Sequence, residues 1–267
     1  MKAYVCDGKV FVYDEDGRWV TINGRHVFIK ERLKKPINGY MPSVIKKVKD
    51  KIDNAVDVII DKYNLTRPKH IFTSDGYGKR VMVGRGKPMT HEEADSGKVN
   101  PHFYIKTINA GLENENCQSC VVAYEMRLRG YNVQARKYSN QLQRRVSDNM
   151  EECWKTIRGK IPKSVKFPKN NPIDFLEKHT KTGRRYCLEM RWLKDAGHIV
   201  SVSKNKDGNL VIYDGQDNTI YTGKDNIAKA FSNGKYFTKL LRIDNLKLNP
   251  KYSDSLIEIT DKKRRKK

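Results

Sequence analysis

Apolar and polar residues alternate over residues 1–30, around two turn-forming dipeptides. Asp7-Gly8 lies inside "YVCDGKVFVY" and Asn23-Gly24 lies inside "WVTINGRHVFI". Such dipeptides between alternating residues are typical of two-residue hairpin turns. The pattern predicts a small β-rich appendage over residues 1–40.

A different pattern begins near Pro42 and Ser43, two residues that suit the start of a helix. Apolar side chains then recur at three- and four-residue steps: Val44, Ile45, Val48, Ile52, Val56, Ile59 and Tyr63. This spacing predicts an amphipathic helix, and we interpret its stripe as facing the core rather than a partner. Glycine and proline then become frequent around "RVMV", so residues 41–91 are expected to be a helix and a connector with one short strand.

Residues 92–252 mix helical and strand patterns, which predicts an α+β unit. Helical spacing is found in "CQSCVVAYEMRLRG", "SNQLQRRVSDNMEECWKTI" and "PIDFLEKHT". "RRYCLEMRWL" alternates like a strand, and "GHIVSVS" and "LVIYDGQ" are expected to form a hairpin. Short elements follow in "TIYTG", "KDNIAKAF" and "KLLRIDNLKL", and residues 253–267 are expected to be a basic tail.

The net positive charge of the chain bears on which partners it could bind. Lys and Arg number 54 against 31 Asp and Glu, a formal net charge of +23. That excess suits a protein that works beside nucleic acid, but it also fits a soluble protein with a basic surface. The tail adds six consecutive cations as tentative nucleic-acid contacts: Lys262, Lys263, Arg264, Arg265, Lys266 and Lys267. No apolar run reaches the roughly 18 residues of a membrane span, and the start lacks the apolar segment of a secretory signal.

Candidate chemistry begins with Cys117 and Cys120 at the start of a predicted helix. Free N–H groups and the helix dipole at that position favour a reactive thiolate. The alternative is a pair of inert core thiols. The chain has five cysteines, without a second close pair for a four-cysteine zinc site, so no metal or other cofactor is expected.

The predicted hairpin supplies a second candidate. If residues 204–208 form its loop, His198 lies directly opposite Asp214, with apolar residues continuing the same face. A carboxylate beside a histidine fixes its tautomer and stabilises its cation, and such a histidine can take a proton from a thiol. A structural core histidine with an incidental turn aspartate is the alternative.

These residues together resemble a known family. "NCQSCVVAYEMRLRGY", a Trp-containing strand and "GHIVSVSKNKDGNLVIYDGQ" are similar to the papain-like toxin domains of the glutamine-deamidase type. The likeness is strongest to versions fused to phage minor head proteins or found beside them, which share a lead-in like "EEADSGKVNPHF". It covers roughly residues 92–245. It implies a papain-like core, with an N-terminal nucleophile helix packed on an antiparallel sheet.

By position, the resemblance implies a catalytic triad of Cys117, His198 and Asp214. Gln216 matches the glutamine after the family's aspartate, although Gly215 stands where phage versions usually carry proline. Asn116 and the main-chain N–H groups of the helix start are the expected oxyanion donors. Classical papain-type enzymes use the second cysteine of such a run, so Cys120 stays an alternative nucleophile.

The expected function is a cysteine hydrolase acting on a carboxamide, either a glutamine deamidase or a peptidase. Its partner would be a protein substrate from host or phage, and the expected locations are the virion and the bacterial host cytoplasm. The alternative is a non-catalytic virion protein, a minor head or cargo protein of papain-like fold. Such a protein would contact phage capsid or portal proteins, and DNA through its basic surface.

Overall fold

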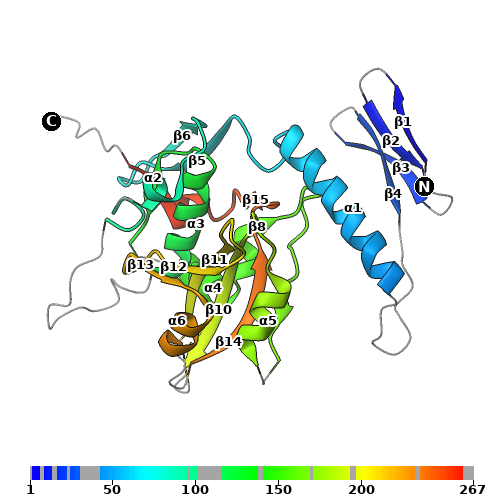
Figure 1. Ribbon diagram of the computed structural model, residues 1–267. Coiled ribbons are helices and arrows are strands. Elements are labelled where there is room, and N and C mark those ends of the chain that lie inside the picture. The colour runs from blue at the N-terminus through cyan, green and yellow to red at the C-terminus, as the bar shows by residue number, and fades with distance from the viewer. Residues whose placement is uncertain are drawn as a thin grey trace, which may run out of the picture. The chain divides into compact units, whose positions relative to one another are not determined.

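The computed structural model in Figure 1 describes the protein in two compact units, Met1–Asn54 and Ala55–Lys267. The described residues are 2–6, 9–13, 17–22, 25–30, 43–95, 97–101, 116–137, 141–168, 171–192, 197–231 and 235–260. Each unit is treated separately below. The candidate chemistry lies wholly in the second unit.

The first unit contains the two predicted hairpins. Strands β1 (Lys2–Cys6) and β2 (Lys9–Tyr13) pair around the Asp-Gly dipeptide. Strands β3 (Gly17–Ile22) and β4 (Arg25–Lys30) pair around the Asn-Gly dipeptide. In both, the residues flanking the dipeptide are directly paired, which is the register that a two-residue turn requires.

Helix α1 (Ser43–Lys62) forms where the apolar stripe predicted it, but the stripe positions from residue 52 onward do not face the core. Ile52, Val56, Ile59 and Tyr63 are exposed, whereas Asp57 and Ile60 are buried. Asp57 lies 2.9 Å from Arg184 and 2.8 Å from Arg242. The core-facing interpretation is therefore wrong for these positions. Asp57 is buried instead, because it forms ion pairs with these two arginines.

A six-stranded antiparallel sheet, in the order β13-β12-β11-β10-β14-β9, forms the centre of the second unit. Its strands are β9 (Val165–Lys166), β10 (Arg185–Trp192), β11 (Gly197–Lys204), β12 (Leu210–Asp214), β13 (Thr219–Thr222) and β14 (Lys235–Arg242). Helices α5 (Pro172–His179) and α6 (Lys224–Ala230) contribute Leu176 and Ile227 to the apolar cluster on one face. Helix α3 (Cys117–Leu128) packs on the other face, against Ile199 and Tyr213.

A smaller sheet joins segments from both ends of this unit, in the order β6-β5-β16-β7. Its strands are β5 (His70–Ser74), β6 (Arg80–Gly84), β7 (Val133–Ala135) and β16 (Ile257–Ile259). Strand β6 was expected from "RVMV", whereas β5 was not. Residues 253–259, expected to begin the tail, instead form α7 (Ser253–Leu256) and β16, because Leu256 and Ile257 are fully buried.

Short elements complete the unit. They are α2 (His91–Asp95), α4 (Gln141–Asp148), the 3-10 turn η2 (Met150–Cys153), β8 (Trp154–Lys155) and β15 (Lys247–Leu248). The expected long helix after residue 139 is thus a short helix, a 3-10 turn and a strand. Among the described residues, no helix is long and apolar enough to cross a membrane.

The β11–β12 hairpin forms as predicted, but its register differs by two residues. Val202 pairs with Ile212 and Lys204 with Leu210, so His198 does not lie directly opposite Asp214. The Asn205 carboxamide oxygen accepts main-chain N–H bonds from Asp207 and Asn209, which closes the loop one residue later than expected. Because the shift is even, every side chain keeps its predicted face.

Candidate active site

Helix α3 carries the candidate nucleophile at its first residue. Cys117 is 8% exposed, and the first main-chain bond of the helix runs from the Cys120 N–H to the Asn116 carbonyl. The N–H groups of the first turn precede that bond and lack helical acceptors. They give the thiol a partly positive environment.

Asn116 fixes the start of this helix from outside. Its amide nitrogen donates to Asn100 Oδ1 at 3.0 Å and to the Arg136 carbonyl at 3.1 Å. Both amide hydrogens are therefore committed, which does not fit the predicted role as an oxyanion donor. The main-chain N–H groups of the first turn remain as the expected oxyanion donors.

His198 lies between the thiol and the carboxylate. Its Nε2 is hydrogen-bonded to Asp214 Oδ2, and its side chain also forms a hydrogen bond with Cys117. Since Asp214 takes Nε2, Nδ1 is the nitrogen available to the thiol. The second carboxylate oxygen of Asp214 accepts the Gln216 N–H at 3.0 Å. The structure thus brings together the three residues that the resemblance implied, and Gln216 acts on Asp214 through its main chain.

The surroundings favour the charged form of this histidine. Burial alone would lower the pKa of His198, but the hydrogen bonds to Asp214 and Cys117 outweigh it and raise the pKa to about 10. The hydrogen bonds to these two side chains stabilise the imidazolium more than the loss of water destabilises it. The arrangement therefore holds a protonated histidine between the Cys117 side chain and the Asp214 carboxylate.

Cys120 is in a different environment, one turn further along the helix. It is 1% exposed, and its Sγ lies 3.5 Å from Asn116 Oδ1. Burial raises the pKa of Cys120 well above its usual value, and the charges of Cys117 and Asp214 raise it further. A thiol that resists ionisation is a poor nucleophile, so the structure favours Cys117 over the alternative.

Two neighbouring side chains were not predicted. Asn100 donates to the Gln216 carbonyl at 2.9 Å while accepting from Asn116, so it joins the helix start to the turn after β12. Gln118 is buried, and its amide has no hydrogen-bond partner among the described residues. Asn100 lies inside "EEADSGKVNPHF", and this position in the family-like lead-in was the available signal.

The remaining candidates are not brought to this site. Cys153 and Cys187 are fully buried in the core beside Met150, and no metal-binding group of His, Cys, Asp and Glu is found within the described ranges. The side chain of Cys6 and the tail residues 262–267 lie outside the described residues.

A mixed helix-and-sheet fold with cysteine, histidine and aspartate side chains in contact has the composition of a papain-like cysteine hydrolase centre. Residues 115–219 match the model of a family described as papain fold toxin 1, glutamine deamidase. The inferred resemblance to papain-like toxin domains of the glutamine-deamidase type is confirmed for this segment, which contains Cys117, His198, Asp214 and Gln216. A comparison with curated proteins gave no match.

Proposed function

We propose that the protein is a cysteine-dependent glutamine deamidase, with Cys117 as nucleophile, His198 as its acid–base partner and Asp214 as the orienting carboxylate. The observation that carries this proposal is the His198 side chain bonded to both Cys117 and Asp214. These residues lie inside the segment that matches the deamidase family.

The reaction would proceed in two halves. The Cys117 thiolate attacks the carboxamide carbon of a glutamine side chain, and the N–H groups at the start of α3 stabilise the oxyanion. The imidazolium of His198 protonates the leaving nitrogen, and ammonia departs as the thioester forms. His198 then takes a proton from water, which attacks the thioester to release glutamate and restore the thiolate and the imidazolium.

Peptide cleavage uses the same groups, so the experiment must separate the two reactions. The 267-residue chain is incubated with clarified bacterial lysate, and the lysate proteins are analysed by mass spectrometry. We expect +1 Da glutamine-to-glutamate changes and release of ammonia, without new peptide termini. New termini without +1 Da changes would show a peptidase instead.

Matched cysteine variants test the assignment of the nucleophile. Cys117→Ala should abolish both the +1 Da changes and thiol alkylation near pH 7. Cys120→Ala should keep both, because it removes only a buried thiol from the packing beneath the helix. If Cys120→Ala abolishes the activity and Cys117→Ala does not, the nucleophile is one helical turn away from the proposed position. If neither substitution changes the +1 Da signal, neither thiol is the nucleophile and the proposal fails.

We also propose that the enzyme is carried in a phage particle and acts on proteins of the bacterial host. This part rests on the sequence likeness to domains linked to phage minor head proteins. Mass spectrometry of purified phage particles from cells that carry the gene should detect the chain together with capsid and portal proteins. Its absence from particles would refute carriage but would leave the enzymatic proposal intact.

A further inference from the structure

The outer face of the β5–β6 hairpin is exposed and combines aromatic, apolar and cationic side chains. Strand alternation places Ile71 and Val83 inward, whereas Phe72 and Met82 lie opposite each other on the outer side. Phe72 is 46% exposed, Met82 62%, and Tyr77 in the connecting turn 66%. We name this the β5–β6 face, formed by Lys69, His70, Phe72, Tyr77, Lys79, Arg80 and Met82.

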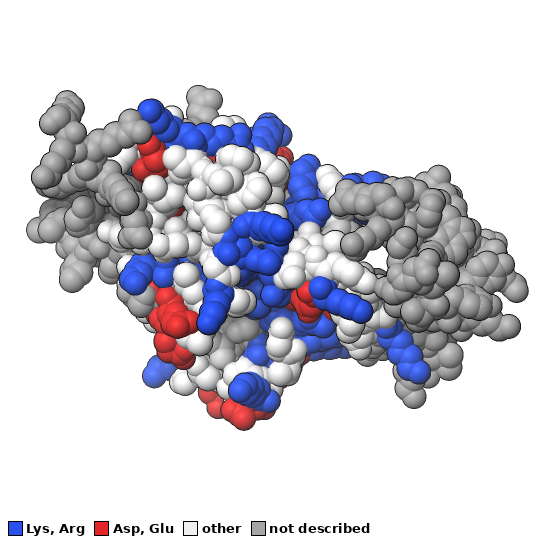
Figure 2. Space-filling model, turned by 90° about the horizontal axis from the view of Figure 1, so that it is seen from above, with Lys and Arg blue, Asp and Glu red and all other residues white. Residues whose placement is uncertain are grey.

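The charge of this segment is strongly one-sided. Residues 67–87 contain six cations, Arg67, Lys69, Lys79, Arg80, Arg85 and Lys87, and one acidic residue, Asp75. Asp75 is already occupied, because its Oδ1 accepts the N–H groups of Tyr77 and Lys79 and shapes the turn. Figure 2 looks onto this side of the fold, where blue Lys and Arg side chains cover more of the visible surface than red ones.

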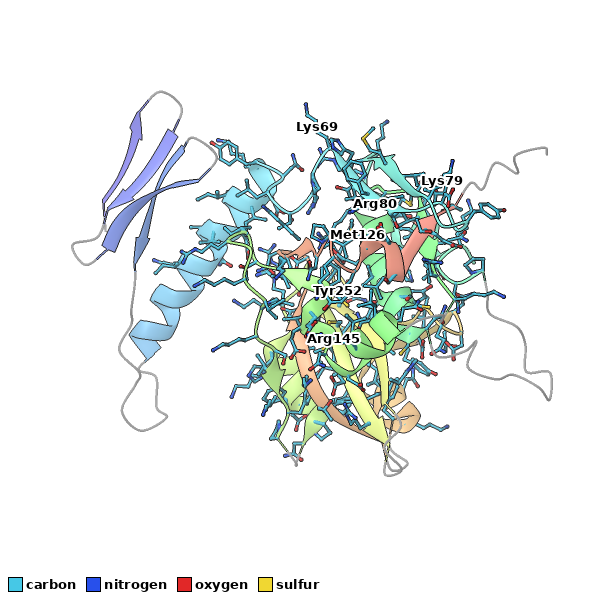
Figure 3. The ribbon with its side chains drawn as sticks, turned by 180° about the vertical axis from the view of Figure 1, so that it is seen from behind. Lys69, Lys79, Arg80, Met126, Arg145 and Tyr252 are labelled. Carbon is cyan, nitrogen blue, oxygen red and sulfur yellow. The ribbon has the colours of Figure 1, made fainter. Side chains whose placement is uncertain are left out.

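The cations are spread along the hairpin. Lys69 lies just before β5 and Lys79 just before β6, at opposite ends of the hairpin, with Arg80 next to Lys79 and all three apart from Arg145 (Figure 3). The Arg80 guanidinium lies over the Phe72 ring at 5.4 Å from its centroid, and the His70 ring meets its edge at 5.7 Å. Arg80 also lies 3.4 Å from Asp254, but both side chains are well exposed, so this ion pair adds little.

We propose that the β5–β6 face binds single-stranded nucleic acid. Exposed aromatic rings inside a cationic surface provide the two contributions that such binding needs: base stacking and phosphate neutralisation. Phe72 and Tyr77 would stack on bases, while Lys69, Lys79 and Arg80 contact the backbone. Charge alone would also fit an acidic protein, but large exposed rings flanked by cations favour unpaired bases over carboxylates.

The test is fluorescence anisotropy with a labelled oligothymidylate about 20 nucleotides long, using the full chain with its basic tail present in every variant. Phe72→Ala and Tyr77→Ala should each weaken binding about five-fold or more, because a lost stack costs roughly 1–3 kcal/mol. Lys79→Gln should reduce the slope of log affinity against log salt by about 0.7. All these residues are exposed, so melting temperatures should stay unchanged.

Matched controls lie elsewhere on the same unit. Ile220→Ala removes an apolar side chain of similar exposure (45%) from β13, and Lys206→Gln removes an exposed lysine from the β11–β12 loop. Ile220→Ala should leave affinity unchanged, and Lys206→Gln should leave the salt slope unchanged. Losses in the controls as large as those in the β5–β6 variants would overturn the proposal.

Two competitor arms distinguish the partner class. A duplex of the same length should compete less well than the single strand, and Phe72→Ala should remove that preference. If polyglutamate displaces the oligonucleotide more readily than unlabelled oligothymidylate does, the face is a docking site for an acidic protein and the nucleic-acid proposal fails. Neither outcome depends on the chemistry at Cys117.

Discussion

At the scale of single residues, the decisive group is a histidine bonded to a carboxylate and to a cysteine side chain. His198 is bonded to Asp214 and Cys117, and these contacts raise its pKa to about 10 although burial acts in the opposite direction. An unperturbed histidine loses its proton near pH 6.5. Across the range between these values, the folded protein therefore keeps an imidazolium that an exposed histidine would have lost.

We expect the ring resonances of His198 to titrate near pH 10 in an NMR experiment. Asp214→Asn should lower that midpoint, because a neutral amide cannot stabilise the cation as a carboxylate does. Cys117→Ala should also lower it, since the thiolate is the second stabilising partner. A wild-type midpoint near 6.5 would show that His198 is not held in this pair and would remove the basis for a resting thiolate.

Some residues of the candidate site could be predicted from the sequence and others could not. A thiol at a helix start and a histidine and an aspartate on one hairpin face are local features, so the sequence could predict them. Asn100 was missed because its bonds to Asn116 and to the Gln216 carbonyl join segments far apart in the chain. Only folding brings these segments together.

At the scale of elements, the end of α3 depends on one glycine. Gly130 has φ +98°, and its carbonyl accepts the Gly86 N–H at 2.8 Å. A Cβ at this position would lie 2.6 Å from the Gly86 carbonyl oxygen and 2.7 Å from that of Lys87. Both the left-handed backbone and this close approach therefore require glycine.

Gly130→Ala should lower the free energy of unfolding by at least about 2 kcal/mol, from left-handed strain plus a backbone clash. Gly159→Ala is the matched control, because Gly159 has φ +79° but no atom within 4 Å of the added Cβ. Urea denaturation of both variants separates the two contributions. Equal losses would mean that strain alone matters and that the contact with residues 86–87 gives way.

The sequence predicted the elements that have a strong local pattern. It did not predict how those elements face or pair with their neighbours. Helix α1 forms as its spacing indicates, yet it buries Asp57 because it pairs with Arg184, just before β10, and with Arg242, at the end of β14. Neither partner can be read from the pattern of the helix itself. The β11–β12 register slipped by two residues because Asn205 closes the loop. In both cases, a polar contact overrode an apolar pattern that was correctly identified.

At the scale of the whole molecule, distant segments are tied together by buried charge. Arg129, the residue directly after α3, donates to the main-chain carbonyls of Thr66, Ile243 and Leu246. Its Nε also lies 2.7 Å from Glu125, whose pKa falls to about 2 because Arg185 and Arg129 outweigh the effect of burial. One guanidinium thus connects the helix to segments before and after it.

The C-terminal end of that unit gives the sharpest global prediction. Removal of residues 261–267 should leave the melting temperature unchanged, because the last strand ends at Ile259. Removal of residues 253–267 should lower the free energy of unfolding by roughly 3–6 kcal/mol, since the burial of Leu256 and Ile257 is lost. It also deletes the strand between β5 and β7 and the acceptors of the Thr73 hydroxyl.

The two truncated proteins are compared with the full chain by thermal melting followed by circular dichroism. Since a typical domain is stable by only about 5–15 kcal/mol, the longer deletion should remove a large part of the stability of the second unit and clearly lower its melting temperature. Thiol alkylation at Cys117 should then lose its selectivity, because α3 rests on the same apolar cluster as Leu256 and Ile257. If the longer deletion has the same melting temperature as the full chain, the smaller sheet is stable without β16. The folded unit would then end at residue 252, as the sequence pattern predicted.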